Sequence, residues 1–373
     1  MVNYNKLDTL LSGSFKEAIE EKIFSGAAFG FIFFNEGKFH RFERYYGSCS
    51  YEKSSTVVNS RTLFDLASLT KPLATLPALL HLMASHSLKW ETSLADVFGS
   101  SLPPEKTKIT FQQLVTHSAG FPSHRNYYID LIKQPEQMRK KQLLQAILEE
   151  SLEYQPGKQQ LYSDLDFMLL GFLIEKKSAV DLKSYVEDRL YKPLGLKNDL
   201  FFPSPSSHHS AVETEKCPWS GKMLSGQVHD DNCRAMGSVA GHAGLFGTLI
   251  GVLRAGEGLL TQYLNKNKSG LCQGVDLRQE LVKDGKNRCW PLGFDRPAET
   301  GSSSGRYLSS SAFGHLGFTG TSLWIDPEQQ LVIVLLSNRV HPSRENTKIR
   351  QFRPLIHDCV LEWLRSQTTP TKK

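Results

Sequence analysis

The chain has 373 residues, with 44 Lys and Arg against 38 Asp and Glu, so its net charge at pH 7 is a mild +6. That length exceeds one small hydrophobic core and predicts two domains, or one large domain with an insertion. Because no basic stripe is interleaved with aromatic residues, a nucleic-acid partner is not expected.

The distribution of cysteines and apolar residues excludes further classes of protein. The six cysteines are scattered without a Cys-x-x-Cys pair, which argues against a zinc knuckle and against a disulfide scaffold. The first thirty residues contain no apolar core flanked by basic residues, and no apolar run reaches membrane-spanning length. The pattern predicts a cytoplasmic protein without membrane contact and leaves its oligomeric state open.

The first predicted elements are a helix and a hairpin. Residues 5–24 have helical periodicity, and two β-runs follow over residues 27–34 and 38–46. The turn signal Asn35-Glu36-Gly37 lies between the runs and predicts that they pair as antiparallel strands.

Helical patterns dominate the middle of the chain, before a loop rich in Pro and Ser over residues 201–227 and a further helix over 249–264. The predicted helices of the middle region cover residues 72–83, 111–117, 140–152, 162–176 and 182–190.

The last third returns to strands and ends in a helix. Strands are predicted over residues 310–313, 322–325 and 331–336, and an amphipathic helix over 350–365. Strands at both ends with helices between them predict an α/β (α+β) fold, in which the two ends build one largely antiparallel sheet.

Ser68 and Lys71 form the most informative motif, Ser-Leu-Thr-Lys. On a helix this spacing places an amine beside a hydroxyl, and a neutral lysine can take the serine proton. Apolar residues precede Ser68 and a Leu- and Ala-rich segment follows it, so the lysine is expected to be buried, as it must be to lose its proton near pH 7. A second match, Ser50 to Lys53, lies in a polar stretch and serves as an internal control.

Two further places carry candidate side chains. Tyr162 opens a strongly apolar predicted helix, and its hydroxyl could reach a cleft as general base or proton shuttle. His315 and Gly317 precede a β-run, where glycine lets an edge strand approach a substrate closely. The backbone amides of Ser68 and Phe318 are candidates for an oxyanion hole, which would stabilise the transition state by about 3–4 kcal/mol.

The ordered set resembles the serine β-lactamase and penicillin-binding-protein superfamily, and most of all the class C β-lactamases with their esterase and peptidase relatives. The residues that carry it run from about 27 to 337: Ser-Leu-Thr-Lys at 68–71, Tyr-Ser-Asp at 162–164 and His-Leu-Gly at 315–317, with accessory stretches at 114–120, 241–246 and 314–320.

The resemblance implies a β-lactamase/transpeptidase-like fold, with a helix-flanked antiparallel sheet, an all-α domain and an active site between them. We expect the sheet domain to combine residues 1–75 and 245–373, with residues 76–244 as the mainly helical insertion. The resemblance also implies an acyl-enzyme on Ser68, with Lys71 and Tyr162 sharing the proton transfers.

Two positions depart from the class C pattern, which has asparagine where this chain has Asp164 and lysine where it has His315. Asp164 would hold Lys71 protonated, which favours Tyr162 as the base, although the residues alone leave both open. His315 could change charge near neutral pH and would hold an anionic substrate less firmly than lysine. Both departures disfavour β-lactam and cell-wall-peptide turnover.

The sequence therefore predicts a serine hydrolase acting on small esters or amides without a metal or organic cofactor. Ser68 is the nucleophile, Lys71 and Tyr162 transfer protons, and Asp164, His315 and Gly317 shape substrate choice. The alternatives are a β-lactamase or D,D-peptidase, a D-amino-acid amidase in which Asp164 pairs with the substrate ammonium, and a non-catalytic binding module.

Several of these residues, and some other short sequence stretches, also have a purely structural interpretation. His315 could be bonded to backbone rather than to substrate, and Asp164 could cap a helix. His117 is expected to structure the turn that follows it. The string His229 to Asn232 fits a capped loop better than a metal site, and the glycines of residues 237–247 fit a loop packed near the cleft better than a phosphate cradle.

Overall fold

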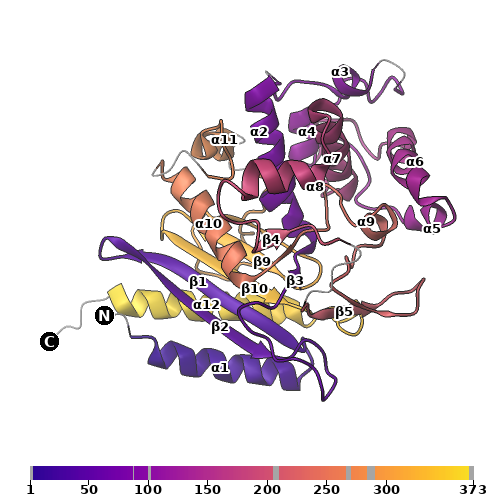
Figure 1. Ribbon diagram of the computed structural model, residues 1–373. Coiled ribbons are helices and arrows are strands. Elements are labelled where there is room, and N and C mark those ends of the chain that lie inside the picture. Colours follow the sequence, from indigo (N-terminus) through magenta and orange to yellow (C-terminus); the bar gives the residue numbers. More distant parts are fainter. Residues whose placement is uncertain are drawn as a thin grey trace.

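The computed structural model describes residues 3–86, 88–99, 102–204, 210–265, 270–283 and 290–368. Residues 205–209 of the predicted loop, and Cys289, lie outside the described residues. The main feature is a five-stranded antiparallel sheet (Figure 1). In spatial order its strands are β2 (Lys38–Gly47), β1 (Gly26–Asn35), β10 (Leu331–Ser337), β9 (Ser322–Asp326) and β8 (Phe313–Leu316).

The two ends of the chain meet in the middle of this sheet. Phe29 of β1 is opposite Leu335 of β10, so residues from both ends of the chain pair directly. The predicted hairpin is also confirmed: Asn35 pairs with Lys38 across a two-residue turn. Both turn residues have positive φ, 50° at Glu36 and 81° at Gly37, as in the turns that match the twist of antiparallel strands.

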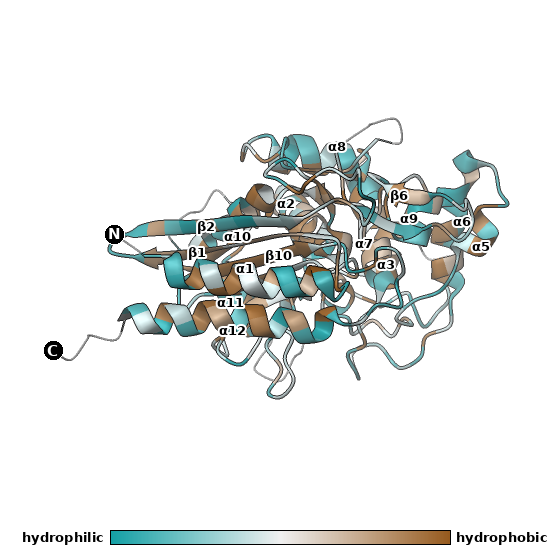
Figure 2. Ribbon diagram, turned by 90° about the horizontal axis from the view of Figure 1, so that it is seen from below, coloured by the Kyte–Doolittle hydropathy of each residue, from teal (hydrophilic) through white to brown (hydrophobic). Residues whose placement is uncertain are grey.

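Helices cover both faces of the sheet, which is why β1 and β10 are almost continuously apolar. Helix α10 (Leu249–Tyr263) packs on one face, against β1, β9 and β10. Helices α1 (Asn5–Glu20) and α12 (Ile349–Thr368) lie side by side on the other (Figures 1 and 2). Each alternates hydrophobic and hydrophilic residues, as a helix with one buried side does (Figure 2).

The middle of the chain forms a second body of helices beside the sheet (Figure 1). The division of the chain at residues 75/76 and 244/245 stays a prediction. The helices are α2 (Leu76–His86), α3 (Leu94–Phe98), α4 (Phe111–Val115), α5 (Tyr128–Leu131), α6 (Glu136–Glu149), α7 (Asp164–Ser178), α8 (Leu182–Val186) and α9 (Asp231–Ala235), with α11 (Leu277–Lys283) further along the chain.

Three short strands, β3 (Phe64–Asp65), β7 (Phe246–Gly247) and β4 (Leu200–Phe201), form a small sheet in which β3 leads into the Ser68 motif. The predicted loop over residues 201–227 is partly wrong, because it contains the pair β5 (Glu213–Lys216) and β6 (Met223–Ser225). The strand predicted at 310–313 is displaced and lies at Phe313–Leu316, the stretch whose backbone pairs with β9.

Among the described residues, each helix is too short or too polar to span a lipid bilayer. The described cysteines form no disulfide; they are Cys49, Cys217, Cys233, Cys272 and Cys359.

Candidate active site

Ser68 lies in a sharp turn directly after β3. The 3₁₀ turn Ala67–Leu69 begins with a φ of 47° at Ala67, a conformation that non-glycine residues rarely adopt. The Asp65 carboxylate accepts the Ala67 N–H at 2.8 Å and supports this turn. Strained backbone of this kind is concentrated at functional sites, and here it leaves Ser68 half-buried at the wall of a pocket.

Lys71 is the first residue of one π-helical turn (Lys71–Thr75) that precedes α2, so the predicted helix over 72–83 begins differently from an ordinary α-helix. Its side chain is fully buried, as the sequence predicts. The Nζ atom lies 3.2 Å from Ser68 Oγ, 2.6 Å from Tyr162 Oη and 2.7 Å from Asp164 Oδ1. Three other predicted site side chains therefore meet at the Lys71 nitrogen.

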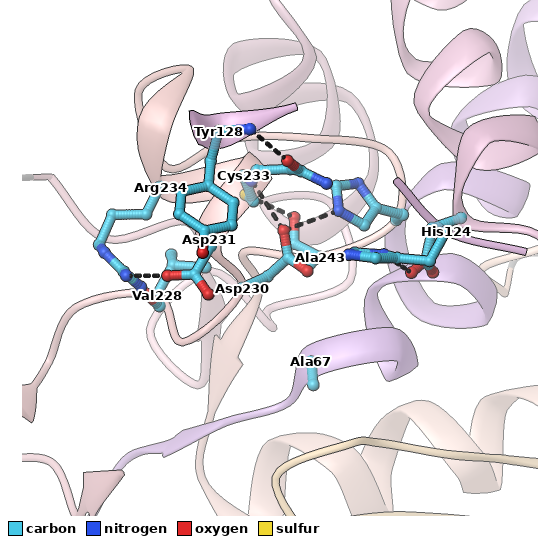
Figure 3. A network of polar contacts seen from close by, with 12 residues as sticks. Ala67, His124, Tyr128, Val228, Asp230, Asp231, Cys233, Arg234 and Ala243 are labelled. Atoms are coloured by element: carbon cyan, nitrogen blue, oxygen red, sulfur yellow. Dashed lines mark hydrogen bonds and ion pairs between the residues drawn. The ribbon is translucent and has the colours of Figure 1, made fainter. Parts of the chain in front are cut away.

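Tyr162 and Asp164 are placed by the start of α7. Tyr162 lies just before the helix rather than in it, Ser163 is the N-cap residue and Asp164 begins the first turn. Asp164 does not cap the helix: its Oδ1 accepts from Lys71, and its Oδ2 lies 3.2 Å from Nδ1 of His124, which Figure 3 shows with its dashed contact. His124 was not foreseen, because no motif links its position to Asp164.

The charges of the cluster follow from this geometry. Burial alone would lower the pKa of Lys71, but the Asp164 carboxylate and the Tyr162 hydroxyl outweigh it and raise that pKa. Burial would raise the pKa of Asp164, but the Lys71 ammonium and the bond from His124 hold it well below its usual range. Burial raises the pKa of Tyr162 despite the opposing Lys71 charge. At neutral pH the cluster is therefore an ion pair beside a neutral phenol.

The edge strand β8 is held against the Ser68 turn by two threonines next to the His-Leu-Gly motif, whose role the sequence did not indicate. Thr319 Oγ1 donates to the Asp65 carbonyl at 2.6 Å, and Thr321 Oγ1 donates to the Leu66 carbonyl at 3.2 Å. A Cβ on Gly317 would lie 2.0 Å from Thr321 Oγ1 and 2.6 Å from the Leu66 oxygen, so this position requires glycine. Gly317 therefore packs against the Ser68 turn, and its close approach to a substrate stays a prediction.

His315 is bonded to backbone and lines the pocket as well, so the two interpretations of this residue are compatible. Its Nδ1 must donate to the Leu316 carbonyl, 2.7 Å away, which leaves Nε2 as an acceptor. Burial, with the nearby Lys71 charge, lowers the pKa of His315 to about 3. The expectation that His315 changes charge near neutral pH is therefore wrong; the ring is neutral there.

The pocket has a volume of about 470 Å³ and includes Ser68, Tyr162, His315, Gly317 and Phe318 in its lining. Phe318 is half exposed, and its carbonyl accepts from Arg339 Nε at 2.7 Å. The backbone amides of Ser68 and Phe318 remain a predicted oxyanion hole.

Three arginines that sequence reasoning missed, Arg339, Arg350 and Arg353, also line the pocket. Burial lowers the pKa of Arg339 and of Arg353 to about 10, so both remain charged at pH 7. Within the described part of the chain none of the three is paired with a carboxylate. They give the pocket lining a positive charge. No motif in the sequence indicated this charge, because the arginines follow the last motif by some twenty residues or more.

The stretch His229 to Asn232 and the glycine-rich stretch of residues 237–247 have structural contacts, as expected. Asp230 caps α9 by accepting the Cys233 N–H at 2.7 Å, and the neighbouring Asp231 pairs with Arg234 (Figure 3). A Cβ on Gly241 would lie 2.0 Å from the Phe167 carbonyl, so that glycine allows the loop to pack tightly on α7 beside the cleft. In the control motif, Lys53 is exposed, and no amine approaches Ser50 among the described contacts.

Comparison with solved structures shows the β-lactamase/transpeptidase-like fold. The simvastatin synthase LovD from Aspergillus terreus superposes with a TM-score of 0.70 at 16% identity, covering 96% of this chain and 98% of its own. EstCE1, described as a hydrolase with promiscuous acyltransferase activity, superposes with a TM-score of 0.72 at 18% identity, covering 95% of this chain and 98% of its own.

Sequence comparison is more specific. A family profile described as β-lactamase matches residues 16–357. A Salmonella typhi protein named "Putative D-alanyl-D-alanine carboxypeptidase" is 33% identical in an alignment over 324 residues that covers 78% of this chain and 72% of the relative. A Salmonella typhimurium protein of the same name is 32% identical over 324 residues, with the same coverage. The chain belongs to the β-lactamase family, within the superfamily of class C-like serine hydrolases.

Proposed function

We propose that the protein is a serine hydrolase that forms an acyl-enzyme on Ser68 and acts on small esters or amides. The observation that carries the proposal is the buried Lys71 amine, within hydrogen-bond distance of both Ser68 Oγ and Tyr162 Oη at the wall of a pocket. A nucleophile and its proton partners in contact are what acyl transfer through serine requires.

Tyr162 is the base in this proposal. Its phenol is protonated in most molecules at neutral pH, and the reactive fraction is the one in which the Lys71–Tyr162 pair has lost one proton to solvent. The two groups are 2.6 Å apart, so they titrate as a coupled pair, and removing one proton gives either amine and phenol or ammonium and phenolate. The Asp164 carboxylate, 2.7 Å from Lys71, favours the ammonium and so places the negative charge on Tyr162.

The reaction then proceeds through two similar halves. The Ser68 oxygen bonds to the substrate carbonyl carbon as its proton passes to the Tyr162 phenolate, and the carbonyl electron pair moves to oxygen at the amides of Ser68 and Phe318. That pair returns, the bond to the leaving alcohol or amine breaks, and Tyr162 gives the leaving group its proton. Water attacks the acyl group in the same way, Tyr162 takes its proton, and Ser68 recovers this proton as the acid leaves.

A second candidate, a D,D-carboxypeptidase-like activity on a substrate with a carboxylate, is favoured by the arginines of the pocket. Guanidinium groups bind carboxylates through charge-assisted hydrogen bonds, and the Salmonella relatives carry the name of such an enzyme. The D-amino-acid amidase is less well supported, because both Asp164 oxygens already have partners, Lys71 and His124. β-Lactam hydrolysis and a binding module remain outcomes of the test.

The test compares hydrolysis of a short-chain p-nitrophenyl ester and a chromogenic cephalosporin by wild type, Ser68→Ala and Ser50→Ala. Ester turnover should disappear in Ser68→Ala and persist in Ser50→Ala, which removes the serine of the unpaired control motif. Equal ester turnover by Ser68→Ala would contradict the proposal, and faster cephalosporin than ester turnover would indicate a β-lactamase. Absence of turnover by all three proteins would favour a binding module.

A cytoplasmic location stays part of the proposal, to be checked by cell fractionation.

A further inference from the structure

His117 contacts the chain on both sides of Tyr162. It is fully buried after α4, with a φ of 53°. Its carbonyl accepts the Leu161 N–H at 2.9 Å, and its ring Nδ1 lies 3.2 Å from the Ser163 N–H, which donates to it. The ring also packs on the Tyr162 ring, with centroids 4.7 Å apart. One residue therefore holds both peptide neighbours of the proposed base and touches its ring.

Asp166 also bonds to the His117 ring. Its Oδ2 lies 3.0 Å from the same Nδ1, and the two side chains are 0% and 1% exposed. Asp166 is in the first turn of α7, two residues after Asp164. The pair thus links the turn after α4 to the helix that begins beside Tyr162.

The contacts assign the shared proton. An imidazole nitrogen has either a hydrogen or a lone pair, and Nδ1 needs its lone pair because the Ser163 N–H points at it. The hydrogen between Nδ1 and Asp166 must then belong to the carboxyl group, and His117 carries its own hydrogen on Nε2. Burial raises the pKa of Asp166 well above its usual value and lowers the pKa of His117 well below its own, which agrees with a neutral pair.

We propose that His117 and Asp166 form an uncharged positioning pair that fixes the backbone on both sides of Tyr162 and so holds its hydroxyl against Lys71. The proposal rests on the role of Tyr162 given above. Neither residue touches a reacting atom, so both are positioning residues. Because the pair is neutral, the charges facing Tyr162 remain those of Lys71 and Asp164, with His315 uncharged.

Four variants test the proposal: His117→Ala, His117→Asn, Asp166→Ala and Asp166→Asn. His117→Ala and Asp166→Ala should lower kcat about 10- to 100-fold, the effect of misplacing a catalytic group by an ångström, with KM little changed. His117→Asn should recover part of kcat, because the Asn Oδ1 can accept the Ser163 N–H and Asn tolerates positive φ. Asp166→Asn should recover most of it, because its amide N–H can replace the carboxyl O–H as donor to Nδ1.

The pH profile separates a neutral pair from an ionised one. If Asp166 is uncharged, Asp166→Asn leaves in place the midpoint of the rising limb of kcat/KM, on which Tyr162 becomes a phenolate. A midpoint that moves by about one pH unit would show that Asp166 carries a charge felt by Tyr162, and would overturn the proposal. Wild-type kcat in both alanine variants would overturn it as well.

A crystal structure of Asp166→Ala or His117→Asn, whichever is the better folded, gives a readout that does not depend on turnover. In Asp166→Ala the Tyr162 hydroxyl should leave its position 2.6 Å from Lys71 Nζ, whereas in His117→Asn it should stay there. An unmoved Tyr162 in Asp166→Ala, or a displaced one in His117→Asn, would contradict the positioning role. If wild type hydrolyses no ester or amide, the proposed function fails, and this structure still decides the positioning role.

Discussion

The Nζ atom of Lys71 lies 2.7 Å from Oδ1 of Asp164, and the lysine is fully buried while the carboxylate is 18% exposed. A buried lysine without a partner would lose its proton, but one beside a carboxylate keeps it. In the proposed mechanism this ion pair keeps Lys71 a cation, which stabilises the Tyr162 phenolate rather than taking the serine proton itself.

Asp164→Asn should move the rising limb of kcat/KM, on which the Lys71–Tyr162 pair loses the proton that makes Tyr162 a base, to lower pH. Asp164 raises the pKa of Lys71 and adds to that of Tyr162, so its removal lets the coupled pair lose its proton at lower pH. A shift of roughly one pH unit or more is expected from the loss of one adjacent charge. Ester hydrolysis measured from pH 6 to 11 gives the midpoint, with Asp188→Asn, an exposed aspartate paired with Lys197, as control. A shift to higher pH would contradict the assignment of the charges.

Tyr162→Phe should lower kcat for ester hydrolysis by about 10²- to 10⁴-fold, the range for loss of a general acid–base group. The ring and its contacts with His117 would remain, so folding should be little affected. Steady-state kinetics and thermal unfolding measured together separate the two effects. Tyr45→Phe is the matched control, because Tyr45 lies on β2 at the opposite edge of the sheet from β8. A Tyr162→Phe protein with wild-type kcat would leave Lys71 as the base.

Arg350→Ala should lower kcat/KM for an ester with a carboxylate near the scissile bond, with much less effect on a neutral ester of the same size. Arg350 is exposed and lines the pocket, so its removal should not disturb the core. A charged hydrogen bond contributes about 1.5–3 kcal/mol, which corresponds to a loss of roughly ten-fold or more. Arg278→Ala, an exposed arginine on α11, is the control. Equal effects on both esters would remove the support for an anionic substrate.

Gly317→Ala should destabilise the protein by about 1–3 kcal/mol, as overpacking does, and reduce turnover, because the new Cβ would meet Thr321 Oγ1 at 2.0 Å. Gly13→Ala is the control, for which the free energy of unfolding should change in the opposite direction. A Cβ there meets nothing within 4 Å, and alanine in a helix is favoured over glycine, so stability should rise by roughly 0.5–1 kcal/mol. Urea unfolding of both variants checks the pair, and a Gly317→Ala protein as stable as wild type would show that β8 can retreat from the Ser68 turn.

Much of the fold followed from local pattern. The β1–β2 hairpin was predictable because Glu36-Gly37 adopts a turn that few residue pairs allow, and β10 because a six-residue apolar run fits a strand buried on both faces. The position of β8 was not predictable from local pattern. Its boundaries depend on pairing with β9 and on Thr319 and Thr321, which hold it against the Ser68 turn.

The sequence by itself determined the family, the strands from the two ends of the chain, and a group of candidate residues that the structure brings together: Ser68, Lys71, Tyr162 and Asp164. Spacing and residue type were enough for Ser68 and Lys71, which are neighbours on one turn, whereas Tyr162 and Asp164 joined them through the order of motifs that the chain shares with the family. Tertiary structure alone decided the charges, since a pKa depends on burial and on neighbours distant in sequence. It made His315 neutral, joined His124 to Asp164, brought three arginines to one pocket and placed His117 against Tyr162.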